Sequence, residues 1–281
     1  FAVALAAGML THVVARKLQV PELVLLLGVG VLLGPEILGV IRPESLGTAL
    51  DYVVGMSVAV ILFEGGLSLR WHEFKEARTS VQRLFIPALP LNWLLGSLAA
   101  HYIGGISWPV SLVFGAIIVI TGPTVIMPLL RHAGLRRRSA SFLKWEGIIN
   151  DPLGALLAVI VFQFFVELQP DTPVTQLALG LLLGIVGGAA IGWLVARLMV
   201  RAFIAGQVAE FLKPPVMLIS VLVAYAAGNA VQQEAGLLAT TVMGMVIGNS
   251  GLADIQEVRR FKEYLAVLLV STVFILLAAD V

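Results

Sequence analysis

Long apolar stretches, separated by short clusters of charged residues, run through the whole chain. Ten of them can be marked, at 1–15, 21–40, 48–69, 84–103, 108–130, 141–166, 174–200, 214–231, 235–249 and 264–281. Most contain about 20 residues, and a helix of that length crosses about 30 Å of hydrocarbon. Because the stretches are too long and too continuously apolar for barrel strands, each is predicted to be a helix. The chain, 1–281, is therefore expected to form a single all-α polytopic membrane domain whose first and last spans are incomplete.

The composition agrees with a membrane protein and excludes several kinds of chemistry. The chain is 59% hydrophobic and only 12% charged, whereas soluble domains are about half apolar and about a quarter charged. It contains no cysteine, which excludes disulfides and zinc-thiolate sites. No span carries a pair of histidines or a nucleophile beside a base. We therefore expect no enzyme, no catalytic residue, no cofactor and no nucleic-acid partner.

The basic residues lie on one side of the predicted membrane domain. Of the 18 lysines and arginines, 17 fall in alternate loops, with Arg42 as the exception. Positive residues are enriched in cytoplasmic loops. The basic loops are therefore predicted to be cytoplasmic and the first residue to lie outside, in a bacterial plasma membrane.

Two pairs of spans have related sequences. Leu23, Gly30 and Gly34 recur at an offset of 214 as Leu237, Gly244 and Gly248, while Tyr52 and Tyr264 precede similar apolar runs at an offset of 212. By the loop count, the second and ninth spans cross in opposite directions, as in inverted repeats. Ordinary helix packing also uses such glycine spacing, so both interpretations stay open. The repeat would comprise 1–166, a linker helix at 174–205 and a partial copy at 214–281, with the fifth span's counterpart near residue ~335.

The sixth span contains a carboxylate where none is expected. Asp151 lies about ten residues into the span, or about 15 Å deep, and ionisable groups at that depth are expensive and usually functional. Asn150 precedes it and lies one helical turn from Glu146, on the same face. A buried packing role is the alternative for Asp151, and a structural role is equally open for Glu146.

The fifth span is predicted to be interrupted at its centre. Thr121, Gly122 and Pro123 lie near the middle of 108–130, and proline leaves the carbonyl around Val119 without its helical donor. Interrupted helices in transporters offer such carbonyls to ions; a simple proline kink is the alternative. Glu64 ends the third span about 9 Å from its boundary, where it either lines an ion pathway or extends to the interface.

Three motifs, Phe63-Glu64-Gly65-Gly66, Thr121-Gly122-Pro123 and Glu146 to Asp151, follow in this order. With them the chain resembles the sodium/proton antiporters of the monovalent cation:proton antiporter-1 family. The Asn150-Asp151 pair resembles the electroneutral branch, and the chain resembles a truncated member. Two positions depart from the family pattern: Gly122 stands where an aspartate is common, and Gly147 where a hydroxyl is common.

The resemblance implies thirteen helices in two inverted repeats, with two interrupted helices crossing at the ion site, and a homodimer. It implies that Asp151 binds the cation and the proton, with Asn150 beside it, that Glu64 is a further ligand, and that Thr121 offers its carbonyl. The transported monovalent cation, Na⁺ or K⁺, would thus be held by Asp151 and Glu64. Gly122 and Pro123 would form the helix break, and Glu146 would pair with an arginine on a later helix.

The expected mechanism is exchange of a cation for a proton through competition for one midplane carboxylate. With a single such carboxylate, exchange would be one for one and insensitive to membrane voltage. A cation channel or uniporter with the same carboxylates is the first alternative. A non-transporting membrane scaffold is the second, and it requires that Asp151 and Glu64 can be neutralised without effect.

Overall fold

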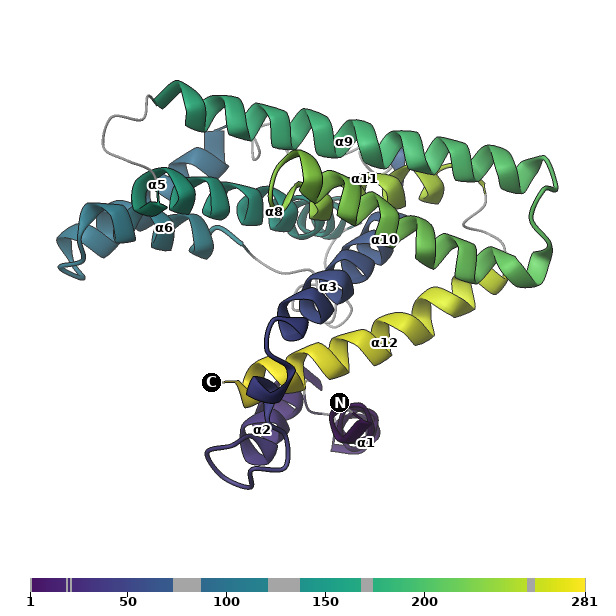
Figure 1. The fold of residues 1–281 in the computed structure, drawn as a ribbon, viewed down its shortest axis with the longest axis horizontal. Helices are drawn as coiled ribbons and strands as arrows, with labels where there is room; N and C mark the ends of the chain where they lie inside the picture. The colour runs from purple at the N-terminus through teal and green to yellow at the C-terminus, as the bar shows by residue number, and fades with distance from the viewer. Residues whose placement is uncertain are drawn as a thin grey trace. The chain divides into compact units, whose positions relative to one another are not determined.

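A computed structural model describes residues 2–18, 20, 22–72, 87–120, 137–167, 174–251 and 256–280. Within these ranges the chain is helical and contains no strand (Figure 1). The ten α-helices are α1 (Ala2–Leu18), α2 (Glu22–Leu33), α3 (Ala49–Ser68), α5 (Leu89–Tyr102), α6 (Trp108–Ile118), α8 (Arg137–Phe162), α9 (Val174–Ile204), α10 (Lys213–Val231), α11 (Ala235–Gly248) and α12 (Gln256–Ala279). Each falls on one of the ten apolar stretches, so the all-α prediction is confirmed.

Among the residues that the structure describes, four helical segments are both long and apolar enough to span a membrane. They are Ala49–Ser68, Ser139–Phe165, Thr175–Ile204 and Glu210–Val231. Shorter apolar helices accompany them, among them Ala235–Gly248. On α9, Leu182, Val186 and Leu198 are each more than half exposed, as expected where side chains face lipid rather than water.

The second span is shorter than predicted. The apolar stretch runs to residue 40, but α2 ends at Leu33. Pro35 disfavours helical geometry at Gly34, and the backbone then folds back, with the Gly39 N–H donating to the Gly34 carbonyl over 2.8 Å. Gly39 has a φ of +61°, which glycine adopts without cost. A span-length hydropathy window does not reveal this turn, because Ile37, Leu38 and Val40 continue the apolar stretch beyond Leu33.

The chain divides into two compact units. The first contains Phe1–Ile61 and Asp254–Val281, and the second contains Leu62–Ala253. These boundaries differ from those of the predicted repeats, which join 1–166 and separate 174–205 and 214–281; the repeat assignment remains a prediction.

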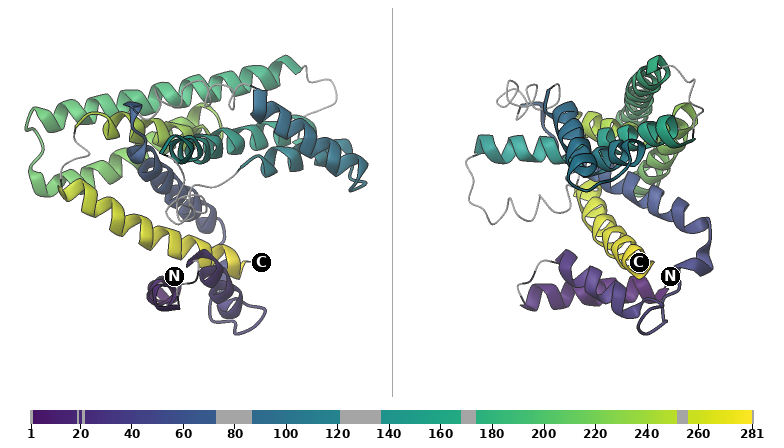
Figure 2. Two further views of the ribbon diagram at one scale, coloured as in Figure 1. Left: turned by 180° about the vertical axis from the view of Figure 1, so that it is seen from behind. Right: turned by 90° about the vertical axis from the view of Figure 1, so that its left-hand side faces the viewer.

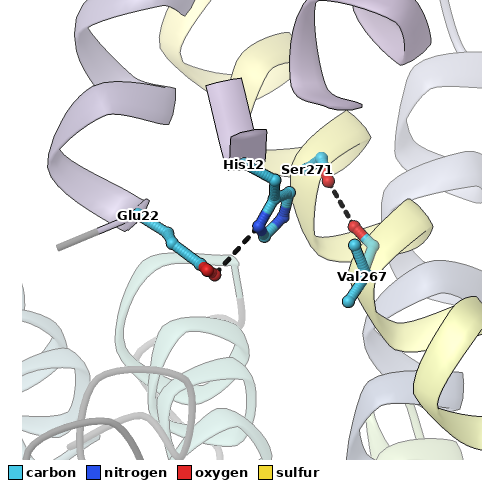
Figure 3. Close-up of polar contacts among 4 residues, drawn as sticks. All are labelled: His12, Glu22, Val267 and Ser271. Carbon is cyan, nitrogen blue, oxygen red and sulfur yellow. Dashed lines mark hydrogen bonds and ion pairs between the residues drawn. The ribbon is translucent and has the colours of Figure 1, made fainter. Parts of the chain in front are cut away.

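In the first unit, α2 and α1 both pack against α12. Its core contains Ala4 of α1, Leu26 of α2, and Ile275 and Leu276 of α12. His12 of α1 pairs with Glu22 of α2, with 2.9 Å between Nδ1 and Oε2 (Figure 3). In the same view the Ser271 hydroxyl donates to the Val267 carbonyl of its own helix. The His12 Nδ1 atom and the Ser271 hydroxyl group therefore each have a partner.

In the second unit, α9, α10 and α11 pack on one another, while α6 packs against both α5 and α8. Figure 2 shows the pairing of α5 and α6 from two further sides. Glycines allow the close approaches: Gly192 of α9 lies against the backbone of Ala239, and Gly228 of α10 lies against Gly236 of α11. Small residues at such crossings are typical of membrane helices.

Two helix crossings, one in each unit, use corresponding residues. Gly30 of α2 faces Ile275 and Ala278 of α12, whereas Gly244 of α11 faces Phe63 and Gly66 of α3. The offset of 214 relates the two glycines, and the offset of 212 relates Phe63 to Ile275 and Gly66 to Ala278. The same relation holds for the crossings of Gly34 with Ala279 and of Gly248 with Leu67. An internal repeat would produce this correspondence.

The turn between α10 and α11 is tight and polar. Glu234 has a left-handed φ of +67°, and burial raises the pKa of its carboxyl group. Asn229 supports the turn, because its Oδ1 accepts a hydrogen bond of 2.9 Å from the Gly236 N–H at the start of α11. This turn lies at the opposite end of α11 from Gly248 and Asn249.

Candidate functional site

Helix α8 carries three of the predicted site residues. Its 26 residues continue through Pro152, and Asp151 lies next to the middle of the helix. Asn150 is only 7% exposed, and its Nδ2 lies 3.4 Å from Glu146 Oε1, one turn earlier. The sequence placed Asn150 and Glu146 on one helix face, and the structure brings their polar groups within hydrogen-bonding distance.

The buried amide of Asn150 also reaches the end of α6. Helix α6 ends at Ile118, and Val119 follows it as the capping residue. The Val119 carbonyl accepts a hydrogen bond of 2.8 Å from Asn150 Nδ2. In a continuous helix this carbonyl would bond to the N–H of residue 123, which is a proline without an N–H. An unpaired buried carbonyl is costly. The side chain of Asn150 supplies the hydrogen-bond donor that the proline at position 123 does not have.

Asp151 follows Asn150 directly and is partly buried. Two of its neighbours along α8, Ile148 and Pro152, are buried, so the carboxylate lies in a largely apolar stretch. Thr121, Gly122 and Pro123, which the sequence assigns to the helix break, lie outside the described residues.

Glu64 lies on the last turns of α3, which pack against α8 and α11. A side chain at Gly65 would meet Ile148 of α8 at 3.5 Å, and Gly66 lies directly against the backbone of α11 at Thr241 and Gly244. The carboxylate of Glu64 is partly buried. Glu64 and the α8 residues Glu146, Asn150 and Asp151 are thus carried by two helices in direct contact.

Basic and aromatic residues gather where α3 ends. Lys144 of α8 donates to the Ser68 carbonyl over 2.5 Å, and Arg70 donates to the Gly248 carbonyl at the end of α11 over 2.6 Å. The rings of Trp71 and Trp145 are 5.9 Å apart. Lys144 and Arg70 thus bond to the C-terminal ends of α3 and α11. At these ends the helix dipole is negative and the carbonyl groups lack intrahelical donors. Arg70 lies just after α3 and Lys144 lies in the first turns of α8, next to basic loops that the sequence predicts to be cytoplasmic.

Asn249 is the functional candidate that the sequence interpretation missed. Its side chain bonds to both α11 and the segment after α3. The available signal was its place directly after Gly248 at the end of an apolar helix, a position where asparagine serves as a cap. Nothing local indicates that two of its partners, Leu69 and Trp71, lie about 180 residues away in the sequence.

Comparison with known proteins identifies the family. The family model described as sodium/hydrogen exchanger, transmembrane, matches residues 1–281. The chain belongs to this family. Membership places it among integral membrane transporters rather than enzymes.

The relatives include antiporters for Na⁺ and antiporters for K⁺. The chain is 24% identical to the probable Na⁺/H⁺ antiporter 2 of Methanocaldococcus jannaschii, over 98% of this chain and 67% of the relative. It is 26% identical to Na⁺/H⁺ antiporter 1 of the same organism, over 88% of this chain and 58% of the relative. Identity to the K⁺/H⁺ antiporter NhaP2 of Shewanella sp. strain ANA-3 is 27%, over 87% of this chain and 42% of the relative.

A solved structure shares the fold. The sodium proton antiporter MjNhaP1 of Methanocaldococcus jannaschii matches with a TM-score of 0.84 and 24% identity, covering 100% of this chain and 69% of that protein. The match confirms the predicted antiporter fold. The predicted total of thirteen helices remains a prediction.

Proposed function

We propose that the protein exchanges a monovalent cation, Na⁺ or K⁺, for protons across a membrane, with Asp151 as the carboxylate that binds each in turn. The observation that carries the proposal is the arrangement around α8. A partly buried carboxylate at the middle of a membrane-length helix directly follows Asn150, whose amide bonds to the Val119 carbonyl at the end of α6. Family membership and the antiporter names of the relatives support the same activity.

Each neighbouring residue has a distinct part in this proposal. Asn150 uses its NH₂ group to hold the Val119 carbonyl, so only its Oδ1 is suited to face a cation. Glu64 provides a second carboxylate at the predicted cytoplasmic side, and Thr121 provides a backbone carbonyl. Glu146 remains a charge-pairing residue, and its Oε1 lies 3.4 Å from Asn150 Nδ2.

Exchange follows from the cost of moving an unpaired carboxylate through hydrocarbon. When Asp151 carries either a proton or a cation, the site is close to neutral and can change its access from one side to the other. When Asp151 carries neither a proton nor a cation, its negative charge makes the change of access costly. The proposed stoichiometry is therefore one for one, and the exchange is insensitive to voltage. We further propose a homodimer in a bacterial plasma membrane, with the basic loops in the cytoplasm.

A pH-gradient experiment tests the proposed function. In proteoliposomes with an acidic interior, the outward proton gradient should drive Na⁺ or K⁺ inward against its own gradient. Clamping the membrane voltage at different values should leave the initial rate unchanged. Cation flux that follows voltage and ignores pH would identify a channel, and no flux of either cation would favour the non-transporting scaffold.

A further inference from the structure

The carboxamide of Asn249 joins the ends of two helices that lie far apart in the sequence. Its Nδ2 donates to the Met245 carbonyl over 2.7 Å, within the last turn of α11, and to the Leu69 carbonyl over 2.8 Å, directly after α3. Its Oδ1 accepts the Trp71 N–H over 2.9 Å. These bonds employ both protons of the amide nitrogen and the oxygen. Aspartate, leucine or serine at this position would not reproduce this set of bonds.

The helices that Asn249 joins are also in backbone contact. Gly244 lies against Phe63 and Gly66, and Gly248 lies against Leu67, so no side chains separate the two backbones. Arg70 adds a bond of 2.6 Å to the Gly248 carbonyl. Glu64 lies within the stretch of α3 that these contacts hold, between Phe63 and Gly65. We refer to the bonds of Asn249 and Arg70 as the α3–α11 clamp.

The clamped end of α3 is also fixed to α8. Lys144 donates to the Ser68 carbonyl, and Ser68 in turn donates to the Gly65 carbonyl over 2.7 Å. Gly65 faces Ile148, which lies three residues before Asp151. The orientation of the end of α3 relative to α8 therefore determines where the Glu64 side chain lies.

We propose that Asn249 is a positioning residue for Glu64, because it fastens α11 to the end of α3 and so holds the Glu64 carboxylate against α8 for binding the transported cation. This inference rests on the proposed function. It assigns no direct contact with the cation to Asn249. A displacement of about 1 Å at a positioned group is enough to weaken binding strongly, and the hydrogen bonds of Asn249 are the connection that a single substitution removes.

The test is Asn249→Ala, measured as cation exchange in proteoliposomes. The apparent KM for the cation should rise about tenfold while Vmax changes less than twofold, since the site is displaced but Asp151 is intact. Asn249→Asp keeps the acceptor for the Trp71 N–H and loses both donors, so its KM should rise at least as much. Asn229→Ala is the matched control, because it removes an asparagine that bonds to the opposite end of α11; its KM should be unchanged.

A double substitution separates positioning from mere stability. In a Glu64→Gln background, Asn249→Ala should produce no further increase in KM, because the group it positions is already gone. Independent, multiplicative effects of the two changes would overturn the proposal, as would a fall in Vmax with an unchanged KM.

If Asn249→Ala does not yield folded protein, Asn249→Gln, which moves the carboxamide by one methylene group, is judged by the same criteria. Wild-type protein that exchanges no cation would contradict the proposed function instead, and the thermal shift on adding Na⁺ or K⁺ would then report whether Asn249 affects binding.

Discussion

Replacement of Asp151 by asparagine is expected to abolish proton-coupled cation exchange. The substitution retains the size of the side chain and its capacity for hydrogen bonding, but it removes both the negative charge and the exchangeable proton. Loss of a group that transfers a proton typically lowers rates by about 10² to 10⁴, so residual exchange should be at most about one hundredth of wild type. The measurement is the initial rate of pH-gradient-driven Na⁺ or K⁺ uptake in proteoliposomes.

Asp51→Asn is the matched control. Asp51 is an exposed residue in the first turn of α3, far along its helix from Glu64, and its neutralisation should leave the uptake rate within about twofold of wild type. The same folded yield and thermal stability for Asp151→Asn as for wild type would show that charge, not folding, accounts for the loss. Exchange at the wild-type rate by Asp151→Asn would eliminate this carboxylate as the shared site.

The second large effect is expected for Asn150→Ala. This change leaves the Val119 carbonyl and Glu146 without the amide that bonds to both. An unsatisfied buried polar group costs about 1–3 kcal/mol, so the protein should lose about that much stability. Exchange should fall about tenfold to a hundredfold, because the end of α6 no longer has a fixed position beside Asp151.

Asn92→Ala provides the comparison, since Asn92 is an exposed asparagine on α5 whose loss removes no buried hydrogen bond. Both variants are assayed for thermal unfolding and for exchange rate at saturating cation. Stability and rate that match wild type in Asn150→Ala would show that the bond to Val119 has no part in either property.

The sequence predicted the helices well because hydropathy and length determine them directly. The predicted stretch 48–69 corresponds to α3 at Ala49–Ser68, and 214–231 corresponds to α10 at Lys213–Val231. Prediction was poorer where the backbone changes direction within apolar sequence. The second span ends at Leu33 because of Gly34 and Pro35, whereas the apolar stretch continues to residue 40.

The site was predictable only where its residues are close in sequence. The i, i+4 spacing of Glu146 and Asn150 and the loss of a donor at Pro123 are local features, and they predict the shared helix face and the unpaired carbonyl near Val119. The bond between Asn150 and Val119 joins two helices and was not predicted. The α3–α11 clamp could not be predicted in this way. Its bonds join residues 69–71 to residues 245–249, and only the packing of Gly244 and Gly248 on α3 brings these segments together.

The central claim, that one carboxylate binds either the cation or the proton, is tested most directly by the pH dependence of the apparent KM for the cation. With wild-type protein in proteoliposomes, competition for a single proton site predicts that KM rises about tenfold for each unit of falling pH below the carboxylate's titration range, while Vmax stays constant. A KM that does not change with pH, with the pH dependence confined to Vmax, would contradict a shared site.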